Sequence, residues 1–133
     1  MLRKIKHMKN LLIISFFALC ITSCKKDDPA TTTSSSFIGN WTGTYIGDDD
    51  HGTFGLNISS TGDIIGTLTS QTFGTSYDFN GTVTSAGQLQ ATAGTGVAVV
   101  VFSGTLSGNS GNGTWQNTTV HPPISGTWTS TRQ

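Results

Sequence analysis

Trp41-Thr42-Gly43-Thr44-Tyr45 is one copy of a five-residue pattern that recurs along the chain: apolar residue, any residue, Gly, Thr, apolar residue. The apolar residues and the Gly alternate with polar positions, and this period of two predicts a β-strand whose Gly shares a face with the apolar residues. A Gly on the inward face lets a strand bend, or lets large side chains cross a narrow interior, and both suit a small barrel. Further copies lie at 64–68, 79–83, 102–106 and 124–128, and Gly113-Thr114-Trp115 is a partial sixth copy.

The stretches between the copies supply further strands and short turns. Residues 53–58 and 88–93 alternate, and 97–102 is apolar on both faces, so we expect it to be well covered. No segment has helical periodicity, and the connections are too short for helical crossovers. The sequence therefore predicts an all-β fold, an antiparallel up-and-down meander of about eight strands closed into a small barrel. The predicted turns are 47–52, 59–62, 70–74, 85–87, 94–96, 108–113 and 117–123.

The N-terminal region has the pattern of an export signal. Residues 1–10 are basic, and 11–22 form an apolar stretch too short to span a bilayer comfortably. Ile21-Thr22-Ser23-Cys24 then resembles the lipobox of bacterial lipoprotein signals, in which the chain is cut before a lipidated Cys. This resemblance implies a signal peptide at 1–23, lipidation of Cys24, a tether at 24–36 and a barrel domain at 37–133. The alternatives are an uncleaved membrane anchor and ordinary secretion with a free Cys24.

The residues after Cys24 bear on the location. Lys25-Lys26-Asp27-Asp28 resembles the surface-export signal of Bacteroidota lipoproteins, and no Asp follows Cys24 directly to resemble an inner-membrane retention signal. We therefore expect the protein to be anchored in the outer membrane by its N-terminal lipid, with the barrel domain exposed on the cell surface. A domain that faces the periplasm is the alternative.

Gly39-Asn40-Trp41 resembles the Gly-x-Trp motif in the first strand of lipocalins and avidins. The stretch 52–68 is similar to the next hairpin of bacterial avidins, and 128–131 resembles a late avidin strand. The resemblance implies a lipocalin/avidin-like barrel. It does not imply biotin binding. Leu68 stands where the avidin hairpin has a Tyr that contacts biotin, and the sequence reaches Gln133 without the final avidin strand whose Asp binds the ureido group of biotin.

Charge restricts the function classes. Residues 24–133 contain seven Asp and three basic residues, which leaves four net negative charges, and residues 37–133 contain no Lys and no Cys. A nucleic-acid surface needs several cations, so we expect no nucleic-acid partner. No nucleophile motif lies near His51 or His121, and Asp63 and Asp78 are candidates for a carboxylate pair only by elimination. We therefore expect that the protein is not an enzyme and binds no cofactor. A hydrolase is the less favoured alternative.

Two groups of residues are candidates for binding. The loop Asp48, Asp49, Asp50 and His51 is a weak candidate for calcium, and a solvated hairpin tip is the simpler interpretation. The four inward aromatic residues Trp41, Tyr45, Trp115 and Trp128 could stack on a ligand such as a sugar, or could simply form the core. The same two interpretations apply to Tyr77, which shares a face with Phe79.

The interior of an eight-stranded barrel is only just wide enough for its own side chains. We therefore expect a largely self-filled interior with a shallow pocket near one mouth. A small molecule, a glycan or a protein would bind there or at the loops 48–51 and 117–121. The alternative is a structural or inhibitor-type envelope protein with a filled core.

Overall fold

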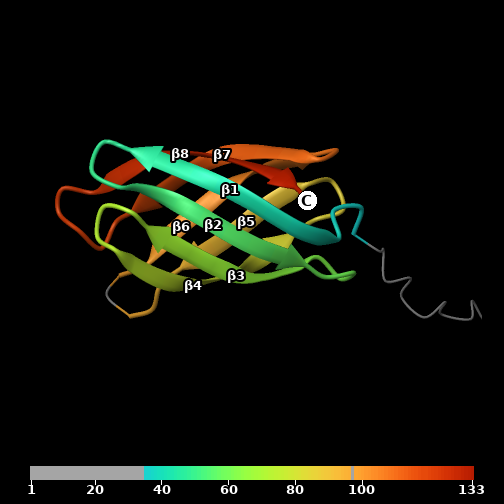
Figure 1. The fold of residues 1–133 in the computed structure, drawn as a ribbon, viewed down its shortest axis with the longest axis horizontal. Coiled ribbons are helices and arrows are strands. Elements are labelled where there is room, and N and C mark those ends of the chain that lie inside the picture. Colours follow the sequence, from blue (N-terminus) through green and yellow to red (C-terminus); the bar gives the residue numbers. More distant parts are fainter. Residues whose placement is uncertain (1–34, 97) are drawn as a thin grey trace, which may run out of the picture. The chain divides into compact units, whose positions relative to one another are not determined.

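The computed structural model describes residues 35–96 and 98–133, which form one closed barrel of antiparallel strands in chain order (Figure 1). Each strand pairs with the next, and the last pairs with the first, so that Trp41 lies opposite Arg132. The predicted fold class is confirmed, whereas the signal peptide, Cys24 and most of the tether lie outside the described residues. The strands are β1 Gly39–Gly47, β2 His51–Ile58, β3 Asp63–Ser70, β4 Thr75–Val83, β5 Gln88–Ala93, β6 Val100–Ser107, β7 Ser110–Asn117 and β8 Ile124–Arg132.

Within the described part of the chain there is no helix long and apolar enough to cross a membrane.

Two predicted boundaries are wrong. The apolar stretch 97–102 is not all strand, since β6 begins at Val100; Ala98 and Val99 belong to the preceding connection, and residues 98–101 are only half-buried. The predicted turn 108–113 is also too long, because only Gly108 and Asn109 separate β6 from β7. Gly111, predicted in the turn, is a strand residue, and so is Gly113, which also begins the partial sixth copy of the strand pattern; both make room for neighbouring side chains.

Inward-facing glycines lie opposite large side chains on the neighbouring strand. A Cβ atom on Gly113 would lie 2.7 Å from Nε1 of Trp128, its cross-strand partner. The relation is reciprocal, because Trp115 on β7 lies opposite Gly126 on β8. The predicted inward orientation of these glycines is therefore confirmed, and each lies opposite a large aromatic or aliphatic side chain of a neighbouring strand. Other such pairs are Gly43–Phe54, Gly52–Tyr45, Gly66–Phe79, Gly81–Ile64, Gly104–Leu89 and Gly111–Leu106.

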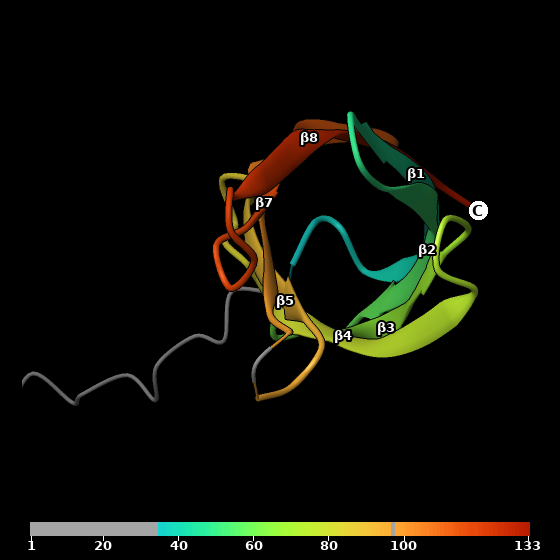
Figure 2. The ribbon, with the colours of Figure 1, turned by 90° about the vertical axis from the view of Figure 1, so that its left-hand side faces the viewer.

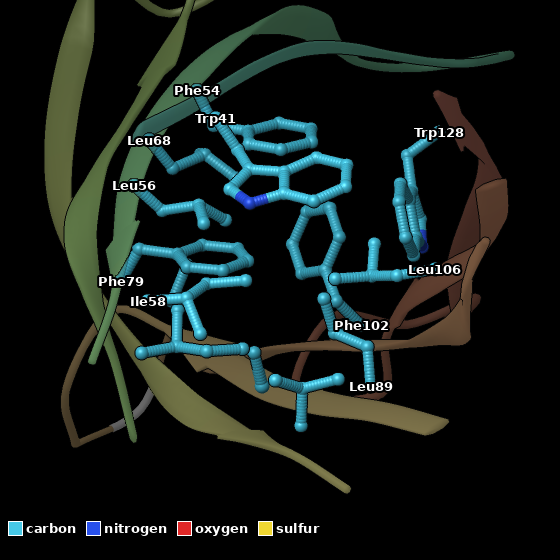
Figure 3. Close-up of a cluster of buried hydrophobic side chains, with 14 of the residues drawn as sticks. Trp41, Phe54, Leu56, Ile58, Leu68, Phe79, Leu89, Phe102, Leu106 and Trp128 are labelled. Atoms are coloured by element: carbon cyan, nitrogen blue, oxygen red, sulfur yellow. The ribbon is translucent and has the colours of Figure 1, made fainter. Parts of the chain in front are cut away.

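Aromatic rings fill the middle of the barrel (Figure 3). The rings of Phe54 and Phe79 stack with their centroids 5.5 Å apart, and Phe102 meets Phe79 at 5.0 Å in an edge-on arrangement. The space between these rings and their aliphatic neighbours has no room for a water molecule. The middle of the interior is thus self-filled, as predicted.

The segment Ser35–Ile38 closes one end of the barrel, and it crosses the lumen at the far end in Figure 2. Phe37 is buried there, and its carbonyl accepts a hydrogen bond of 2.9 Å from Nε1 of Trp41. Arg132 donates to the carbonyl of Ser36, and its guanidinium lies 5.2 Å from the centre of the Trp41 ring. This end is therefore sealed. The opposite end, with the β1–β2, β3–β4, β5–β6 and β7–β8 connections, is called the mouth below (Figures 1 and 2).

Candidate functional site: a cavity at the mouth

A cavity of about 260 Å³ lies at the mouth. A water molecule occupies roughly 30 Å³ of liquid, so the cavity suits a ligand of on the order of ten non-hydrogen atoms. Its lining is mainly apolar, with four aromatic rings and the polar side chains of Asp50 and Asn117. The lining residues are Tyr45, Asp50, Leu68, Phe73, Tyr77, Ala98, Val100, Trp115, Asn117, Val120 and Ile124.

Strand register brings these residues together from six of the eight strands and their connections. Val100, Asn117 and Ile124 lie side by side across β6, β7 and β8, since Val100 pairs with Asn117 and Asn117 with Ile124. On the other side of the barrel, Leu68 of β3 pairs with Tyr77 of β4. Residues far apart in sequence therefore form one layer of inward side chains above the filled middle.

Tyr45 and Trp115 connect the cavity to the aromatic core. The Tyr45 ring meets Trp115 edge-on, with centroids 5.4 Å apart, and meets Phe102 in the same way at 6.0 Å. Trp115 lies across Gly126 of β8, and its Nε1 donates to the carbonyl of Ile46 at 3.2 Å. Both rings are buried and held by packing and hydrogen bonds, so this wall of the cavity is preformed.

Asp50 supplies the one charged group of the lining. Its Oδ1 accepts a hydrogen bond of 2.7 Å from Ser70 Oγ, and its Oδ2 accepts one of 3.1 Å from the Tyr45 hydroxyl. Ser70 Oγ in turn accepts the backbone N–H of Phe73 at 3.0 Å. Asp50 therefore ties the β1–β2 loop to the β3–β4 loop and holds its carboxylate at the cavity.

The same contacts set the protonation state of Tyr45. Burial of the phenol, and then the negative charge of Asp50, raise the pKa of Tyr45 well above its usual range. Tyr45 is therefore a neutral hydrogen-bond donor to Asp50 throughout the neutral pH range, and the carboxylate accepts.

The four aromatic residues proposed from the sequence lie in different places. Tyr45 and Trp115 line the cavity, whereas Trp41 lies at the sealed end. Trp128 belongs to the filled middle, where its Nε1 donates to the carbonyl of Ser103 at 3.2 Å. All four side chains are buried, so the core interpretation holds for each of them. Only Tyr45 and Trp115 also face a space that a ligand could enter.

The acidic loop does not gather around one point. Asp48 and Asp49 are exposed, Asp50 is directed to the cavity, and Nδ1 of His51 lies 3.1 Å from Thr72 Oγ1. Among residues 35–96 and 98–133, no three His, Cys, Asp or Glu side chains are grouped so that they could hold a metal ion. Asp48, Asp49 and Asp50 lie in the β1–β2 connection, whereas His51 is already the first residue of β2.

The two carboxylates considered for hydrolysis are also apart from the cavity. Asp63 accepts a hydrogen bond from Thr61 in the β2–β3 hairpin, at the sealed end of the barrel. Asp78 is exposed on β4, at the polar position opposite Thr67. They do not face each other across a substrate site.

Sequence reasoning missed several members of the cavity. Ser70 stood in a predicted turn, yet its side chain is fully buried and bonded to Asp50. Tyr77 was not missed, because the sequence already offers it as a stacking residue on the same face as Phe79, but its place at the mouth does not follow from the period of two. Phe73 and Val120 lie on loops, for which periodicity gives no direction. The signal that could have found them is the clustering of apolar residues in the connections of one barrel end.

Shallower hollows lie on the outer surface of the barrel. One runs over β1, β2 and β8 and is lined mainly by Thr and Gly, for example Thr44, Thr53 and Gly55. Such short side chains on a convex sheet provide little enclosure, so the mouth cavity is the stronger candidate site.

The chain matches no protein-family model, and no curated protein is significantly similar to it in sequence.

Proposed function

We propose that this chain is a lipid-anchored lipoprotein of the bacterial outer membrane, exposed on the cell surface, whose barrel binds a small ligand in the mouth cavity without catalysing a reaction. One observation carries the binding part: a preformed, largely apolar cavity with a few convergent polar groups above a filled core. Small-molecule sites have this composition. The anchoring part rests on the lipobox resemblance of residues 21–24.

The polar groups of the cavity favour binding over catalysis. Asp50 is its one carboxylate, and both of its oxygens already accept hydrogen bonds. Tyr45 is protonated at neutral pH, as an ordinary phenol is, and its raised pKa makes ionisation harder still, so it is a poor nucleophile and cannot accept a proton as a base. The lining pairs neither of them with a His, Lys or Cys, the usual partners in acid–base or covalent catalysis.

The binding proposal is tested by filling the cavity. Fragments of about ten non-hydrogen atoms are screened against the full chain in detergent by ligand-observed NMR, and hits are repeated with Ile124→Trp. Ile124 is a half-buried lining residue, so the larger ring should occupy the cavity and abolish binding. Ile65→Trp is the matched control, because Ile65 is exposed on β3. Hits that bind Ile124→Trp as well as the wild type would contradict the proposal, as would a screen without hits.

The anchoring proposal predicts that Cys24→Ser stops lipid labelling and leaves an unprocessed precursor, because the thiol is the acylation site of the lipobox. Labelling of cells with a palmitate analogue measures this, and Cys20→Ser, which should remain labelled, is the control. Continued labelling of Cys24→Ser would place the lipid elsewhere. Protease accessibility in intact cells distinguishes the cell surface from the periplasm.

A structural or inhibitor-type role is the second candidate, and the exposed apolar residues of the mouth favour it. Phe73 on the β3–β4 loop is 63% exposed, and Ile46 at the end of β1 is 65% exposed. Phe73 also lines the cavity, but the exposed surfaces of these two residues are available to a protein partner. A protein partner that still binds Ile124→Trp but loses affinity for Phe73→Ser would support this role.

A further inference from the structure

We propose that the mouth cavity selects a small apolar ammonium compound, in which the charged nitrogen pairs with Asp50 and the apolar part lies among the aromatic and aliphatic lining. This inference rests on the proposed ligand-binding function and adds the chemical class of the ligand. It is carried by the position of one carboxylate in a largely apolar space whose other polar side chains, Asn117 and the two tyrosines, are uncharged.

The carboxylate of Asp50 retains capacity for a cation. An ionised carboxylate offers about four acceptor positions, and Tyr45 and Ser70 occupy two of them. Both bonds come from neutral hydroxyl groups, so they leave the negative charge uncompensated. A charge beside apolar walls is costly unless it is paired, and an ammonium group would provide a charge-assisted hydrogen bond.

The surroundings of the carboxylate favour the same sign of charge. Asp48 and Asp49 lie next to Asp50 in the β1–β2 loop and add to the negative potential at the mouth. In the part of the chain that the structure describes, Arg132 is the single Lys or Arg, and it is engaged with Ser36 and Trp41 at the sealed end. A cation is therefore attracted to the cavity, and an anion finds no Lys or Arg there. His51 and His121 also lie at the mouth, but neither lines the cavity.

The apolar lining defines the rest of the ligand. Tyr45, Tyr77 and Trp115 provide ring surfaces beside Asp50, and aromatic rings attract ammonium groups as well as apolar groups. Leu68, Ile124 and other aliphatic side chains complete the walls. Given its volume, the cavity suits an amine with one small ring or a short branched chain, rather than a peptide or an oligosaccharide.

The test compares three probes of nearly equal size and different charge: 2-phenylethylamine, 2-phenylethanol and phenylacetate. Binding to the full chain in detergent is followed by amide chemical shifts in two-dimensional NMR. We expect the amine to bind about tenfold or more tightly than the alcohol, the gain of a charge-assisted contact, and phenylacetate to bind most weakly. The shifts caused by the amine should centre on Asp50, Tyr45 and Ser70.

Substitution then separates the charge of Asp50 from the charge of its loop. In Asp50→Asn the preference for the amine over the alcohol should fall to about twofold or less, whereas Asp49→Asn, an exposed neighbour with the same charge change, should keep it. The amine also partitions into the detergent, but to the same extent with both variants, so this partitioning does not affect their comparison. If Asp50→Asn does not fold, the comparison of the three probes on the wild type remains decisive.

The outcomes distinguish the inference from the function on which it rests. Equal binding of the amine and the alcohol, with both lost in Ile124→Trp, would overturn the charge selectivity and leave the cavity as a binding site. A preference for the amine that Asp49→Asn and Asp50→Asn reduce equally would assign it to the general field of the loop and overturn the direct pairing. Absence of amine binding at millimolar concentration would overturn the inference, while the fragment screen would still decide whether the cavity binds other compounds.

Discussion

At the scale of single residues, the packing of the interior requires Gly at the inward glycine positions as strictly as it requires the large side chains that they face. In most proteins Gly within a strand weakens the sheet, since it contributes no packing and loses more entropy on folding. In this barrel a Cβ at Gly104 would overlap the carbonyl of Asn112 and the Trp128 ring. The absence of a side chain is therefore a packing requirement of the narrow interior.

Replacement of Gly66, Gly81 or Gly104 by Val should each destabilise the barrel by about 1–3 kcal/mol, because the new side chain overlaps backbone of the neighbouring strand. Urea unfolding measures the loss. Gly55→Val is the control, since no atom lies within 4 Å of its added Cβ on the outer face, and it should change stability by less than about 0.5 kcal/mol or increase it. Equal stability of all four variants and the wild type would show that the glycines are not packing sites.

Tyr45 gives a prediction about pH. Its pKa is raised in the folded state, whereas an unfolded Tyr titrates near pH 10. Above about pH 10 the unfolded chain loses this proton and the folded chain keeps it, so stability should fall as pH rises, by at most about 1.4 kcal/mol per pH unit. Tyr45→Phe should lack this part of the decline in urea unfolding between about pH 9 and pH 11. Parallel profiles for the two proteins would contradict the assignment.

At the scale of elements, the segment Ser35–Ile38 acts as a plug although it is neither helix nor strand over most of its length. Its contribution to stability comes mainly from the ring of Phe37, which is buried beside Trp41 with the two ring centroids 6.4 Å apart. Two hydrogen bonds fix its backbone. Trp41 Nε1 donates to the carbonyl of Phe37, and the N–H of Ser35 donates to the carbonyl of Ser60 at 2.8 Å.

Phe37→Ala should therefore lower the free energy of unfolding by about 3 kcal/mol, because it removes the largest apolar side chain of the plug and leaves a cavity over Trp41. Ile38→Ala should cost less than about 1 kcal/mol, because Ile38 is 44% exposed. Thermal and urea unfolding of the two variants are compared directly. A loss at Phe37 no larger than at Ile38 would mean that the barrel end is stable without the plug.

The elements also show what could be predicted from the sequence. The period of two placed all eight strands, because the inward and outward faces of a small barrel differ sharply in polarity. The start of β6 was wrong because 97–102 is apolar throughout, so that its composition does not mark where the loop ends. The cavity depends on loop conformation and on the bond from Ser70 to Asp50, which joins positions 20 residues apart, and neither has a local sequence signal.

At the scale of the whole molecule, the pairing of β1 with β8 distinguishes a closed barrel from a curled sheet. The register extends from Trp41 opposite Arg132 to Gly47 opposite Gly126. Closure satisfies the backbone groups that would otherwise form two exposed edges, and such edges invite aggregation. The seam between the first and last strands should therefore be as stable as the hairpins.

Native-state hydrogen exchange tests this closure. Amides that are hydrogen-bonded between β1 and β8 should exchange only by global unfolding. Their protection should equal that of amides bonded between β2 and β3, because all of these pairs belong to one cooperative core. Fast exchange confined to β1 and β8 would contradict it and indicate a barrel that opens at this seam.

The sealed end has a practical consequence. The described chain enters at Ser35 and ends at Gln133, and both lie at that end: Arg132 bonds to Ser36, and the Gln133 N–H bonds to the carbonyl of Asn40 at 2.9 Å. A fusion tag on the C-terminus therefore emerges away from the cavity, and a short Gly-Ser linker could join Gln133 to Ser35 without spanning the barrel. Such a circular permutant, opened at an exposed hairpin such as Ser85-Ala86, would keep every mouth loop intact and allow immobilisation with the cavity facing the sample.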